Sequence, residues 1–502
     1  MTANVALPPA TPVAEIPALA SAARNTVSEH QRHPTFSPSA LLRAVATQLE
    51  GARANLVAAA QQETSLPEAR LQGELTRTTR QLVAFAQLAE SGLESDAIID
   101  LADPAAEPPR PDQRRLAVPI GPVAVFAASN FPFAFSVAGG DTAAAWAAGC
   151  PVLLKAHAAH TRTSVLTATA VAQGLADAGA PKAWFTMVYG ASPEVGQALV
   201  NADSVEAVAF TGSFGAGTAI ARAAAARPRP IPAFCEMGST NPVVITPASA
   251  QNNGKAIAAG LATSITGSVG QLCTKPGLIL LVDDEAGRQL VAELSGRIAE
   301  NAPATMLYRD IRDRFVSAVI EAADDPRVDA LVAHPSASAS GQASAALLAT
   351  ATKELAPGDV LLEEIFGPAS LVIWAEDESD LVHSVEKLPG TLTATLHASP
   401  ADPLAGPLLH ALSARAGRIV YNGYPTGVTV GHATVHGGPF PATTAAAHTS
   451  VGMTAIRRFQ RPLGYQDVPD ELLPPALRDA NPLGLQRRVD GAITAASVTR
   501  VR

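Results

Sequence analysis

The sequence predicts an α/β protein in which parallel strands alternate with helices along two consecutive regions of the chain. In the first region, which begins near Leu116, short apolar runs alternate with longer helical stretches. Strands that alternate with helices form a parallel sheet covered by helices on both faces. Ligands of such sheets bind beside the carboxyl ends of the strands. The expected strands are 123–127, 151–155, 184–189, 207–210 and 243–245, and the expected helices are 141–148, 161–178, 193–201 and 216–226.

A second alternating region is expected from about residue 242 to about residue 421. Its expected strands are 278–282, 371–374 and 392–396, and its expected helices are 252–268, 284–300 and 380–388. Residues 422–444 are dense in Gly, Pro and Thr, which predicts a loop.

The chain before these regions is predicted to be mostly helical. Residues 1–36 are rich in Ala and Pro and are expected to form a loose arm. Ser37 precedes Pro38, which is typical of a helix start, and leucines recur at helical spacing through Leu56. A second helix is expected at 68–91, and a Pro-rich connector follows it at 104–111.

Composition excludes several classes of protein. A chain of 502 residues is too long for one ordinary core, so two or three domains are expected. The net charge of −9 argues against a nucleic-acid-binding face, which would be basic. No run of about 18 apolar residues is uninterrupted, and residues 1–24 lack the features of a secretory signal, so neither a membrane span nor secretion is expected. Three cysteines give no disulfide framework, which favours a cytoplasmic protein.

Cys273 is the strongest candidate for a catalytic residue. It lies in a polar, glycine-bearing loop between an expected helix and an expected strand. Structural cysteines pack among apolar side chains, whereas nucleophilic ones lie at element boundaries where backbone N–H groups stabilise the thiolate. Cys150 and Cys235 stand in apolar surroundings and are expected to be small core residues.

Three segments follow strands of the first region. Asn130 can present its amide N–H to a substrate oxygen, or it can cap the turn before Pro132. Lys155 ends a strand, where it can hold a ribose hydroxyl or a phosphate, or simply be solvated. The turn from Gly212 to Gly217 contains three glycines before a helix, which suits a phosphate at the helix N-terminus but equally a tight strand–helix turn.

Two acidic positions need separate interpretations. Glu236 lies in a mainly apolar strand, where burial would raise its pKa towards neutrality, as a general base requires. The alternative for Glu236 is a hydrogen-bonded structural residue. The segment that begins at Glu363 is, by itself, typical of a solvated helix or loop end.

A metal site is not predicted. His157 and His160 have a metal-like spacing, as do His432 and His436, but the second pair lies in a Gly-rich loop. No Cys or carboxylate completes either pair in the sequence, so neither forms a recognisable ligand set.

Taken together, these segments resemble the aldehyde dehydrogenase superfamily. Each segment alone is weak, but the ordered set at these spacings is specific, and the resemblance extends from about residue 63 to about residue 482. The matching segments are the one ending in Asn130, then Lys155, Phe210-Thr211-Gly212-Ser213, Glu236-Met237-Gly238, Cys273 and Glu364-Ile365-Phe366-Gly367-Pro368.

Within the superfamily the chain is most similar to α-ketoglutaric semialdehyde (2,5-dioxopentanoate) dehydrogenases. Bacterial NADP-linked fatty aldehyde dehydrogenases share part of the pattern, so a fatty or broad-specificity aldehyde dehydrogenase is the alternative. The segments that carry this similarity are 128–132, 138–142, 226–232, 236–239, 425–428 and 436–443.

The resemblance implies a Rossmann-like cofactor domain, an α/β catalytic domain and a small oligomerisation element. The expected NAD(P)-binding domain covers residues 1–240, with 112–128 contributing to oligomerisation. The catalytic domain with the Cys nucleophile is expected at 241–435, and residues 436–502 are expected to make subunit contacts. A homodimer or homotetramer is implied, with a small aldehyde as substrate and without nucleic-acid or membrane partners.

The resemblance also implies roles for the site residues. Cys273 attacks the aldehyde to form a thiohemiacetal, the Asn130 amide and the Cys273 backbone N–H stabilise the oxyanion, and Glu236 activates the water that hydrolyses the thioester. The cofactor is held by Lys155, by the turn containing Gly212, Ser213 and Gly217, by Gly238, and by Glu364 and Phe366 around the nicotinamide ribose. The alternative from another class is a non-catalytic oligomeric protein with the same fold. The presence of Asn130, Glu236 and Cys273 argues against it, because such a protein would be free to lose them.

Three positions bear on the cofactor and the substrate. Many NAD-preferring relatives carry a glutamate three residues after the strand-end lysine, where this chain has Ala158, so NADP is favoured over NAD, with His157 as a candidate helper. Subgroup members carry Asp and Arg near residues 445–447, which are alanines here, and this leaves open a less charged aldehyde. Lys275 replaces a frequent Asn and is expected to point to solvent.

Overall fold

The computed structural model describes residues 7–332 and 341–498. Its first sheet has five parallel strands in the order β5-β4-β3-β6-β7. Four of these strands match strands expected in the first region, and the fifth is the apolar strand that ends at Glu236. The remaining expected strand, 243–245, belongs instead to the second sheet. Their bounds are β3 (Val123–Phe126), β4 (Val152–Lys155), β5 (Phe185–Val188), β6 (Ala207–Thr211) and β7 (Ala233–Glu236).

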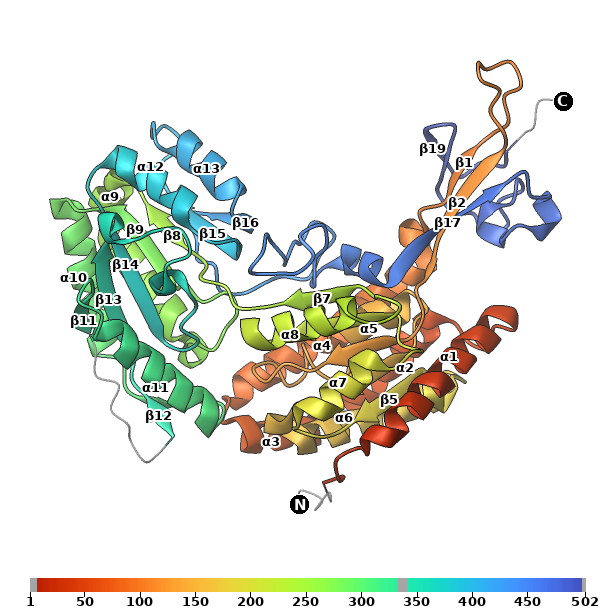
Figure 1. The fold of residues 1–502 in the computed structure, drawn as a ribbon, viewed down its shortest axis with the longest axis horizontal. Helices are drawn as coiled ribbons and strands as arrows, with labels where there is room; N and C mark the ends of the chain where they lie inside the picture. Colours follow the sequence, from red (N-terminus) through yellow and green to blue (C-terminus); the bar gives the residue numbers. More distant parts are fainter. Residues whose placement is uncertain (1–6, 333–340, 499–502) are drawn as a thin grey trace.

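Helices cover both faces of this sheet (Figure 1). Alternation along each strand directs successive side chains to opposite faces, so Val125 packs with one helical layer and Ala124 with the other. One layer contains α2 (Pro38–Gly51), α4 (Glu68–Ser91), α5 (Gly140–Ala147) and α6 (Thr161–Asp177), and the other contains α1 (Ile16–Arg32), α7 (Pro193–Asn201) and α8 (Phe214–Ala225).

The expectation of a loose N-terminal arm is wrong for most of residues 7–36. The α1 helix buries Ile16, Ala20, Ala23 and Val27, which are spaced at helical intervals. The first three pack in the core on the outer face of the sheet. Small alanine side chains let the helix approach the sheet closely, and their weak hydrophobic pattern is why the helix was not predicted.

The predicted helix start at Ser37 is confirmed. Its hydroxyl accepts a hydrogen bond from the Ala40 N–H at 3.1 Å, which caps the first turn of α2. The predicted continuation to Leu56 is not one helix, because α2 ends at Gly51 and α3 (Arg53–Thr64) begins after Ala52. The predicted helix at 68–91 is confirmed as α4.

The second sheet has seven strands in the order β11-β13-β14-β9-β8-β15-β16. Its strands are parallel except for β11, which pairs antiparallel with β13. The bounds are β8 (Val243–Ile245), β9 (Leu278–Val282), β11 (Asp329–Val332), β13 (Ala346–Ala351), β14 (Ala369–Ala375), β15 (Thr391–His397) and β16 (Ala416–Tyr421), with helices α9 (Pro247–Thr266), α10 (Glu285–Ala299), α11 (Arg309–Ala323), α12 (Glu378–Lys387) and α13 (Ala405–Ser413).

A third sheet forms an arm that projects away from the two larger units (Figure 1). Its strand order is β17-β2-β1-β18-β19, which joins the N-terminal and C-terminal parts of the chain. Segment 112–128, which was expected to contribute to oligomerisation, supplies β2 to this arm and β3 to the first sheet. The domain boundaries at residues 240 and 435 stay a prediction. The bounds are β1 (Ile98–Asp100), β2 (Gln113–Pro119), β17 (Gln460–Gln466), β18 (Arg487–Val489) and β19 (Ala492–Thr494), and β10 (Ala304–Thr305) pairs separately with β12 (Gln342–Ala343).

The predicted loop after the second sheet is confirmed and is longer than expected. Between β16 and the short 3₁₀ helix Met453–Phe459, the described chain contains no helix and no strand. This segment returns to the first sheet, where the Met237 N–H donates to the Ala442 carbonyl at 2.8 Å. In the ranges that the structure describes, no helix is long and apolar enough to cross a membrane.

Candidate active site

The strand ends of the first sheet bring four predicted segments to one edge. Because β3, β4, β6 and β7 are parallel and pair in register, their carboxyl ends coincide. Asn130 follows β3, Lys155 ends β4, the Gly212 turn follows β6 and Glu236 ends β7. The edge predicted to hold the site is therefore a real feature of the fold.

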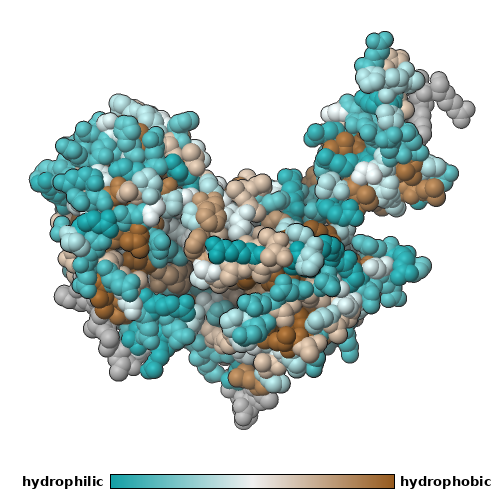
Figure 2. Space-filling model, in the orientation of Figure 1, coloured by the Kyte–Doolittle hydropathy of each residue, from teal (hydrophilic) through white to brown (hydrophobic). Residues whose placement is uncertain are grey.

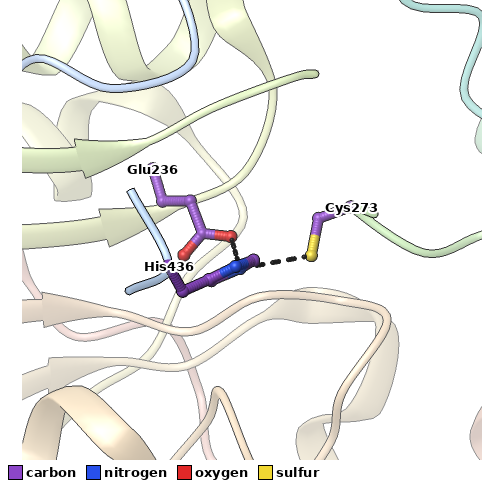
Figure 3. Close-up of side chains that lie close together, drawn as sticks. All are labelled: Glu236, Cys273 and His436. Atoms are coloured by element: carbon purple, nitrogen blue, oxygen red, sulfur yellow. Dashed lines mark hydrogen bonds and ion pairs between the residues drawn. The ribbon is translucent and has the colours of Figure 1, made fainter. Parts of the chain in front are cut away.

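Glu236, Cys273 and His436 meet at this edge (Figure 3). The Nε2 atom of His436 lies 2.7 Å from Oε1 of Glu236 and 3.5 Å from Sγ of Cys273. Glu236 ends β7, Cys273 lies in the loop before β9, and His436 lies in the loop after β16. The imidazole of His436 thus lies between the thiol of Cys273 and the carboxylate of Glu236 and contacts both.

His436 is held firmly although its loop has no regular structure. Its backbone N–H donates to Oγ1 of Thr449 at 2.8 Å, and its carbonyl accepts from the Ser450 N–H at 2.8 Å. Its Nδ1 is buried and has no hydrogen-bond partner among the described residues. Because the Glu236 carboxylate can only accept a hydrogen bond, we assign a hydrogen to the Nε2 atom that faces it.

The environment of Glu236 corrects the predicted direction of its pKa shift. Burial alone would raise the pKa of this carboxyl, but His436 and the donating hydroxyl of Ser450 outweigh burial and hold the pKa below its ordinary value. Both carboxylate oxygens accept hydrogen bonds, since Oε1 faces His436 and Oε2 faces Ser450. Glu236 is therefore ionised near neutral pH and ready to accept a proton.

The Cys273 thiol has the opposite tendency. Burial raises its pKa well above the ordinary value, and the negative charges of Glu236 and Glu364 raise it further. The thiol is therefore protonated before reaction, beside an ionised carboxylate. A nucleophile of this kind needs a base within hydrogen-bond reach, and Glu236 is the adjacent proton acceptor.

The loop that carries Cys273 is conformationally strained just before the thiol. Ser268 and Val269 have φ angles of 51° and 55°, in the left-handed region that β-branched residues avoid. Asn241 fixes the other side of the loop, because its amide donates to the carbonyl of Cys273 at 2.8 Å. Backbone strain of this kind is typical of residues that a protein must place accurately.

Asn130 contacts the loop that carries the thiol. It is buried, and one of its amide hydrogens is donated to the Gln271 carbonyl at 3.1 Å, two residues before the thiol. The amide has a second hydrogen, and the Cys273 backbone N–H donates to no residue that the structure describes. Two donors near one thiol suit an oxyanion, and this role stays a prediction.

The predicted cofactor residues lie on the same side of the molecule. Ser213 caps α8, its Oγ accepting from the Ala216 N–H at 3.4 Å. A Cβ at Gly212 would strike the Phe210 ring, and a Cβ at Gly217 would strike Met237, so packing requires both glycines. Only Gly215 faces open space, which leaves room for a phosphate at the helix N-terminus.

Glu364 and Phe366 reach this side from the second sheet. Glu364 lies directly over Gly238. A Cβ added at Gly238 would collide with the Oε2 atom of Glu364. Phe366 is partly buried and packs against the main core. The structure therefore brings Gly238 together with Glu364, which are 126 positions apart by their residue numbers.

Lys275 does not point to solvent, so that prediction is wrong. Its side chain is buried, and Nζ donates to the Ile365 carbonyl at 3.2 Å and to the Ala369 carbonyl. Burial lowers the pKa of Lys275 to about 8, although the nearby Glu364 charge opposes this, and burial raises the pKa of Glu364 to about 7. Lys275 thus ties the nucleophile loop to the segment that carries Glu364.

The remaining cysteines are core residues, as predicted. Cys150 and Cys235 are buried, and burial raises the pKa of each to about 12. Alternation along β7 turns Cys235 away from Glu236 and into the core on the outer face of the sheet.

His436 and Ser450 are functional candidates that the sequence did not reveal. The prediction that no Cys or carboxylate would accompany either histidine pair is wrong in the folded protein. A carboxylate oxygen of Glu236, the sulfur of Cys273 and a ring nitrogen of His436 lie within 4.8 Å of one another. That no metal belongs there stays a prediction. Two signals in the sequence point to His436, which are its spacing from His432 and its place at the start of a segment that carries the resemblance.

Comparison with known proteins gives a consistent result. A profile described as "Aldehyde dehydrogenase family" matches residues 3–439. The α-ketoglutaric semialdehyde dehydrogenase 2 of Azospirillum brasilense is 45% identical over 471 residues, which are 93% of this chain and 90% of that protein. The α-ketoglutaric semialdehyde dehydrogenase of Acinetobacter baylyi is 41% identical over 483 residues, or 96% and 91% of the two chains.

Solved structures show the same fold. A betaine aldehyde dehydrogenase from Staphylococcus aureus superposes with a TM-score of 0.76 at 17% identity, covering 90% of this chain and 88% of that one. An NAD-dependent aldehyde dehydrogenase from Sinorhizobium meliloti superposes with a TM-score of 0.74 at 21% identity, covering 92% and 89%. The fold class that the sequence resemblance implied is confirmed.

Proposed function

Because the chain belongs to the aldehyde dehydrogenase family, we propose that it oxidises 2,5-dioxopentanoate to 2-oxoglutarate with NADP as the preferred nicotinamide cofactor. The observation that carries the chemistry is the contact of Cys273, His436 and Glu236, which places a nucleophile beside an ionised base. The substrate rests on two relatives, both named for α-ketoglutaric semialdehyde, that are 45% and 41% identical over most of the chain.

The first chemical step forms a bond between Cys273 and the aldehyde. Glu236 accepts the thiol proton, and Sγ attacks the carbonyl carbon, so that the C=O electron pair moves to oxygen. The second amide hydrogen of Asn130 and the backbone N–H of Cys273 stabilise that oxyanion.

The second half of the reaction releases the acid. The bound cofactor supplies a nicotinamide that accepts the hydride from the former aldehyde carbon and so leaves a thioester on Cys273. Glu236 first returns its proton to solvent, and then takes a proton from water as the water oxygen attacks the thioester carbon. The C–S bond breaks, and the sulfur regains a proton as the carboxylate product leaves.

The residues around the strand ends suit a dinucleotide. Lys155 lies at the end of β4, Gly215 leaves an open approach to the first turn of α8, and Glu364 lies beside Gly238. We assign the phosphates to the α8 turn and the two riboses to Lys155 and Glu364. His157 cannot add positive charge there, because burial lowers its pKa to about 3, helped by the charges of His160 and Lys155.

Replacing Ala158 with glutamate is expected to reverse the cofactor preference. Ala158 is exposed beside Lys155, so no carboxylate repels a 2′-phosphate there. The ratio of kcat/KM for NADP to that for NAD is expected to fall at least about 10-fold in Ala158→Glu, because two like charges would meet. A wild-type protein that strongly prefers NAD would contradict the assignment.

Replacing His436 with leucine is expected to move the acid limb of the pH–rate profile to higher pH. His436 opposes the burial that raises the Glu236 pKa, so its loss lets that pKa rise and leaves less ionised base below it. We expect a shift of about 1–3 pH units in kcat, measured from pH 5 to pH 9. His432→Leu, an exposed position in the same loop, serves as the control and is expected to leave the limb in place.

We propose a homo-oligomer whose subunits meet through the projecting arm, and a cytoplasmic location. Large apolar side chains are exposed there, since Leu472, Leu483 and Ile493 are 71%, 57% and 70% exposed. Figure 2 shows hydrophobic patches on this arm, and exposed apolar patches of this kind are typical of subunit contacts. All three cysteines are free, as is usual in a reducing compartment.

The substrate is tested by comparing kcat/KM for 2,5-dioxopentanoate with kcat/KM for medium-chain aliphatic aldehydes, using each cofactor. We expect the acid semialdehyde with NADP to give the highest value. A higher value for aliphatic aldehydes would instead assign the protein to fatty or broad-specificity oxidation. No turnover of any aldehyde by the intact protein would reject the mechanism itself.

A further inference from the structure

Arg77 on α4 is a partly buried cation that forms no direct polar contact with the residues that the structure describes. Among the residues that the structure describes, none accepts a hydrogen bond from its guanidinium or forms an ion pair with it, and its Nε atom is fully buried. Its Cζ lies 5.3 Å from the centroid of the Phe135 ring, and its charge interacts with Glu74, Cys273 and Glu236. A guanidinium carries five N–H donors, so an interior arginine without an acceptor is unusual.

Arg77 lies on the side of the active site that faces the thiol. The Phe135 ring on which it stacks lies 6.4 Å from the His436 ring, and His436 contacts the Cys273 sulfur. Burial raises the pKa of the Cys273 thiol, and the Arg77 charge opposes that rise. Arg77 is therefore linked to the reacting sulfur both through the Phe135 and His436 rings and through its charge.

Two other arginines near the site are already committed to the protein. Arg70 donates to the Asn130 carbonyl at 2.7 Å and lies 3.9 Å from the Glu74 carboxylate. Arg418 donates to the carbonyls of Gly427 at 2.9 Å and Pro425 at 2.6 Å. Arg77 differs from both because none of its donors is used by the described residues, whereas Arg70 uses Nη2, and its buried Nη1 is without a partner among them.

The balance of charge around Arg77 favours an incoming anion. The acid whose charge acts most strongly on Arg77 is Glu74, whose Oε1 already accepts from the N–H groups of Phe133 and Ala134, at 2.8 and 3.0 Å. Arg70 shares the charge of Glu74, so two arginines face one carboxylate. At the thiol itself, Glu236 and Glu364 would repel an anionic substrate, and a cation at Arg77 offsets that repulsion.

We infer that Arg77 forms a carboxylate-binding subsite, which holds the acid end of an aldehyde acid while its aldehyde carbon meets Cys273. The inference rests on the proposed function and explains how the chain can take an acid semialdehyde without charges at residues 445–447. In an extended five-carbon aldehyde acid the two terminal carbons are about 5 Å apart, given C–C bonds of about 1.5 Å. Paired N–H donors of a guanidinium match the two oxygens of a carboxylate.

The test compares two substrates that differ only at the far end. 5-Oxopentanoate and pentanal have the same length, and only the first carries a carboxylate. The measured quantity is the ratio of kcat/KM for 5-oxopentanoate to kcat/KM for pentanal. In Arg77→Met this ratio is expected to fall about 10- to 100-fold, since hydrogen bonds between charged groups are lost. Arg77→Lys keeps the charge without the paired donors and is expected to give an intermediate ratio.

Arg80→Met is the matched control, because Arg80 is exposed on the same helix. It is expected to keep the wild-type ratio. A ratio that Arg77→Met leaves unchanged would overturn the inference, as would an equal loss for both substrates. The wild type could also oxidise 5-oxopentanoate with a ratio that depends on Arg77 and yet not oxidise 2,5-dioxopentanoate. That result would support the Arg77 subsite and reject the proposed substrate.

A measurement without turnover guards against an inactive variant. Glutarate, the acid formed from 5-oxopentanoate, is expected to slow the alkylation of Cys273 by iodoacetamide in the wild type. In Arg77→Met the same glutarate concentration is expected to give little protection. Equal protection of both proteins would show that the carboxylate binds elsewhere and would reject the subsite.

Discussion

Replacing Cys273 with alanine is expected to lower NAD(P)H formation from aldehyde by at least about 10⁴-fold, to the background rate. The reason is that no other thiol can form the thioester, since Cys150 and Cys235 are buried and burial raises the pKa of each to about 12. The measurement is steady-state absorbance of the reduced cofactor at saturating aldehyde. Cofactor binding by the same variant, measured calorimetrically, reports whether the site is otherwise intact.

Cys150→Ala is the matched control for the loss of a thiol. Cys150 is buried in the main core, and its thiol donates to the Phe459 carbonyl at 3.3 Å. We expect that variant to keep turnover within about 3-fold of the wild type and to lose at most about 1 kcal/mol of stability through the missing hydrogen bond. Full activity in Cys273→Ala would reject covalent catalysis at this residue.

Replacing Glu236 with glutamine is expected to stop the reaction after one turnover. The amide keeps the shape of the side chain but cannot accept a proton, so thioester hydrolysis loses its base. The thiol can still react, because removing the Glu236 charge removes one cause of the raised Cys273 pKa and lets the thiol lose its proton to solvent. General-base removal costs about 10²- to 10⁴-fold, and the loss is expected in steady-state kcat. In a rapid-mixing experiment the variant would release reduced cofactor in a burst that approaches one equivalent per subunit and then becomes slow.

The Ser450→Ala variant distinguishes the role of the Glu236 carboxylate from that of the hydrogen bond it accepts from Ser450. Ser450 donates to Oε2 of Glu236, so its loss removes one of two hydrogen bonds without removing the carboxylate. We expect that variant to turn over continuously at a reduced rate and to show no burst. An identical burst in both variants would mean that hydrolysis depends on the local hydrogen-bond network rather than on the carboxylate of Glu236.

Local patterns in the sequence were sufficient for the architecture around the site. Each strand of the first sheet is a short apolar run, and the residues that carry chemistry follow these runs directly. Parallel pairing then places Asn130, Lys155 and Glu236 at one edge, without further information. The thiol was identifiable because only three cysteines exist and only Cys273 lies outside an apolar context.

The features that sequence reasoning missed depend on contacts between distant segments. His436 reaches Cys273 from 163 positions away by residue number, along a loop whose path no local pattern predicts. Lys275 is buried because the carbonyls of Ile365 and Ala369, about 90 positions on, accept its hydrogen bonds. The pKa of Glu236 moved in the direction opposite to that expected from burial, because the same distant loop supplies His436 and Ser450.

The missed helix α1 has a different cause. Its four buried residues, Ile16, Ala20, Ala23 and Val27, are regularly spaced. Two of them are alanines, whose small side chains mark the apolar face of a helix only weakly. Arg77 was overlooked for a related reason. One arginine among several on α4 is unremarkable in sequence, and only the absence of a described acceptor in the fold separates it from Arg70.

The central claim is that Cys273 carries the acyl group between hydride loss and hydrolysis. The most direct measurement is the intact mass of Glu236→Gln after mixing with 2,5-dioxopentanoate and NADP, followed by peptide mapping. The account predicts a mass increase equal to one acyl group per subunit, located on the peptide that contains Cys273 and absent without cofactor. Reduced cofactor released in the burst without any acyl group on Cys273 would contradict it.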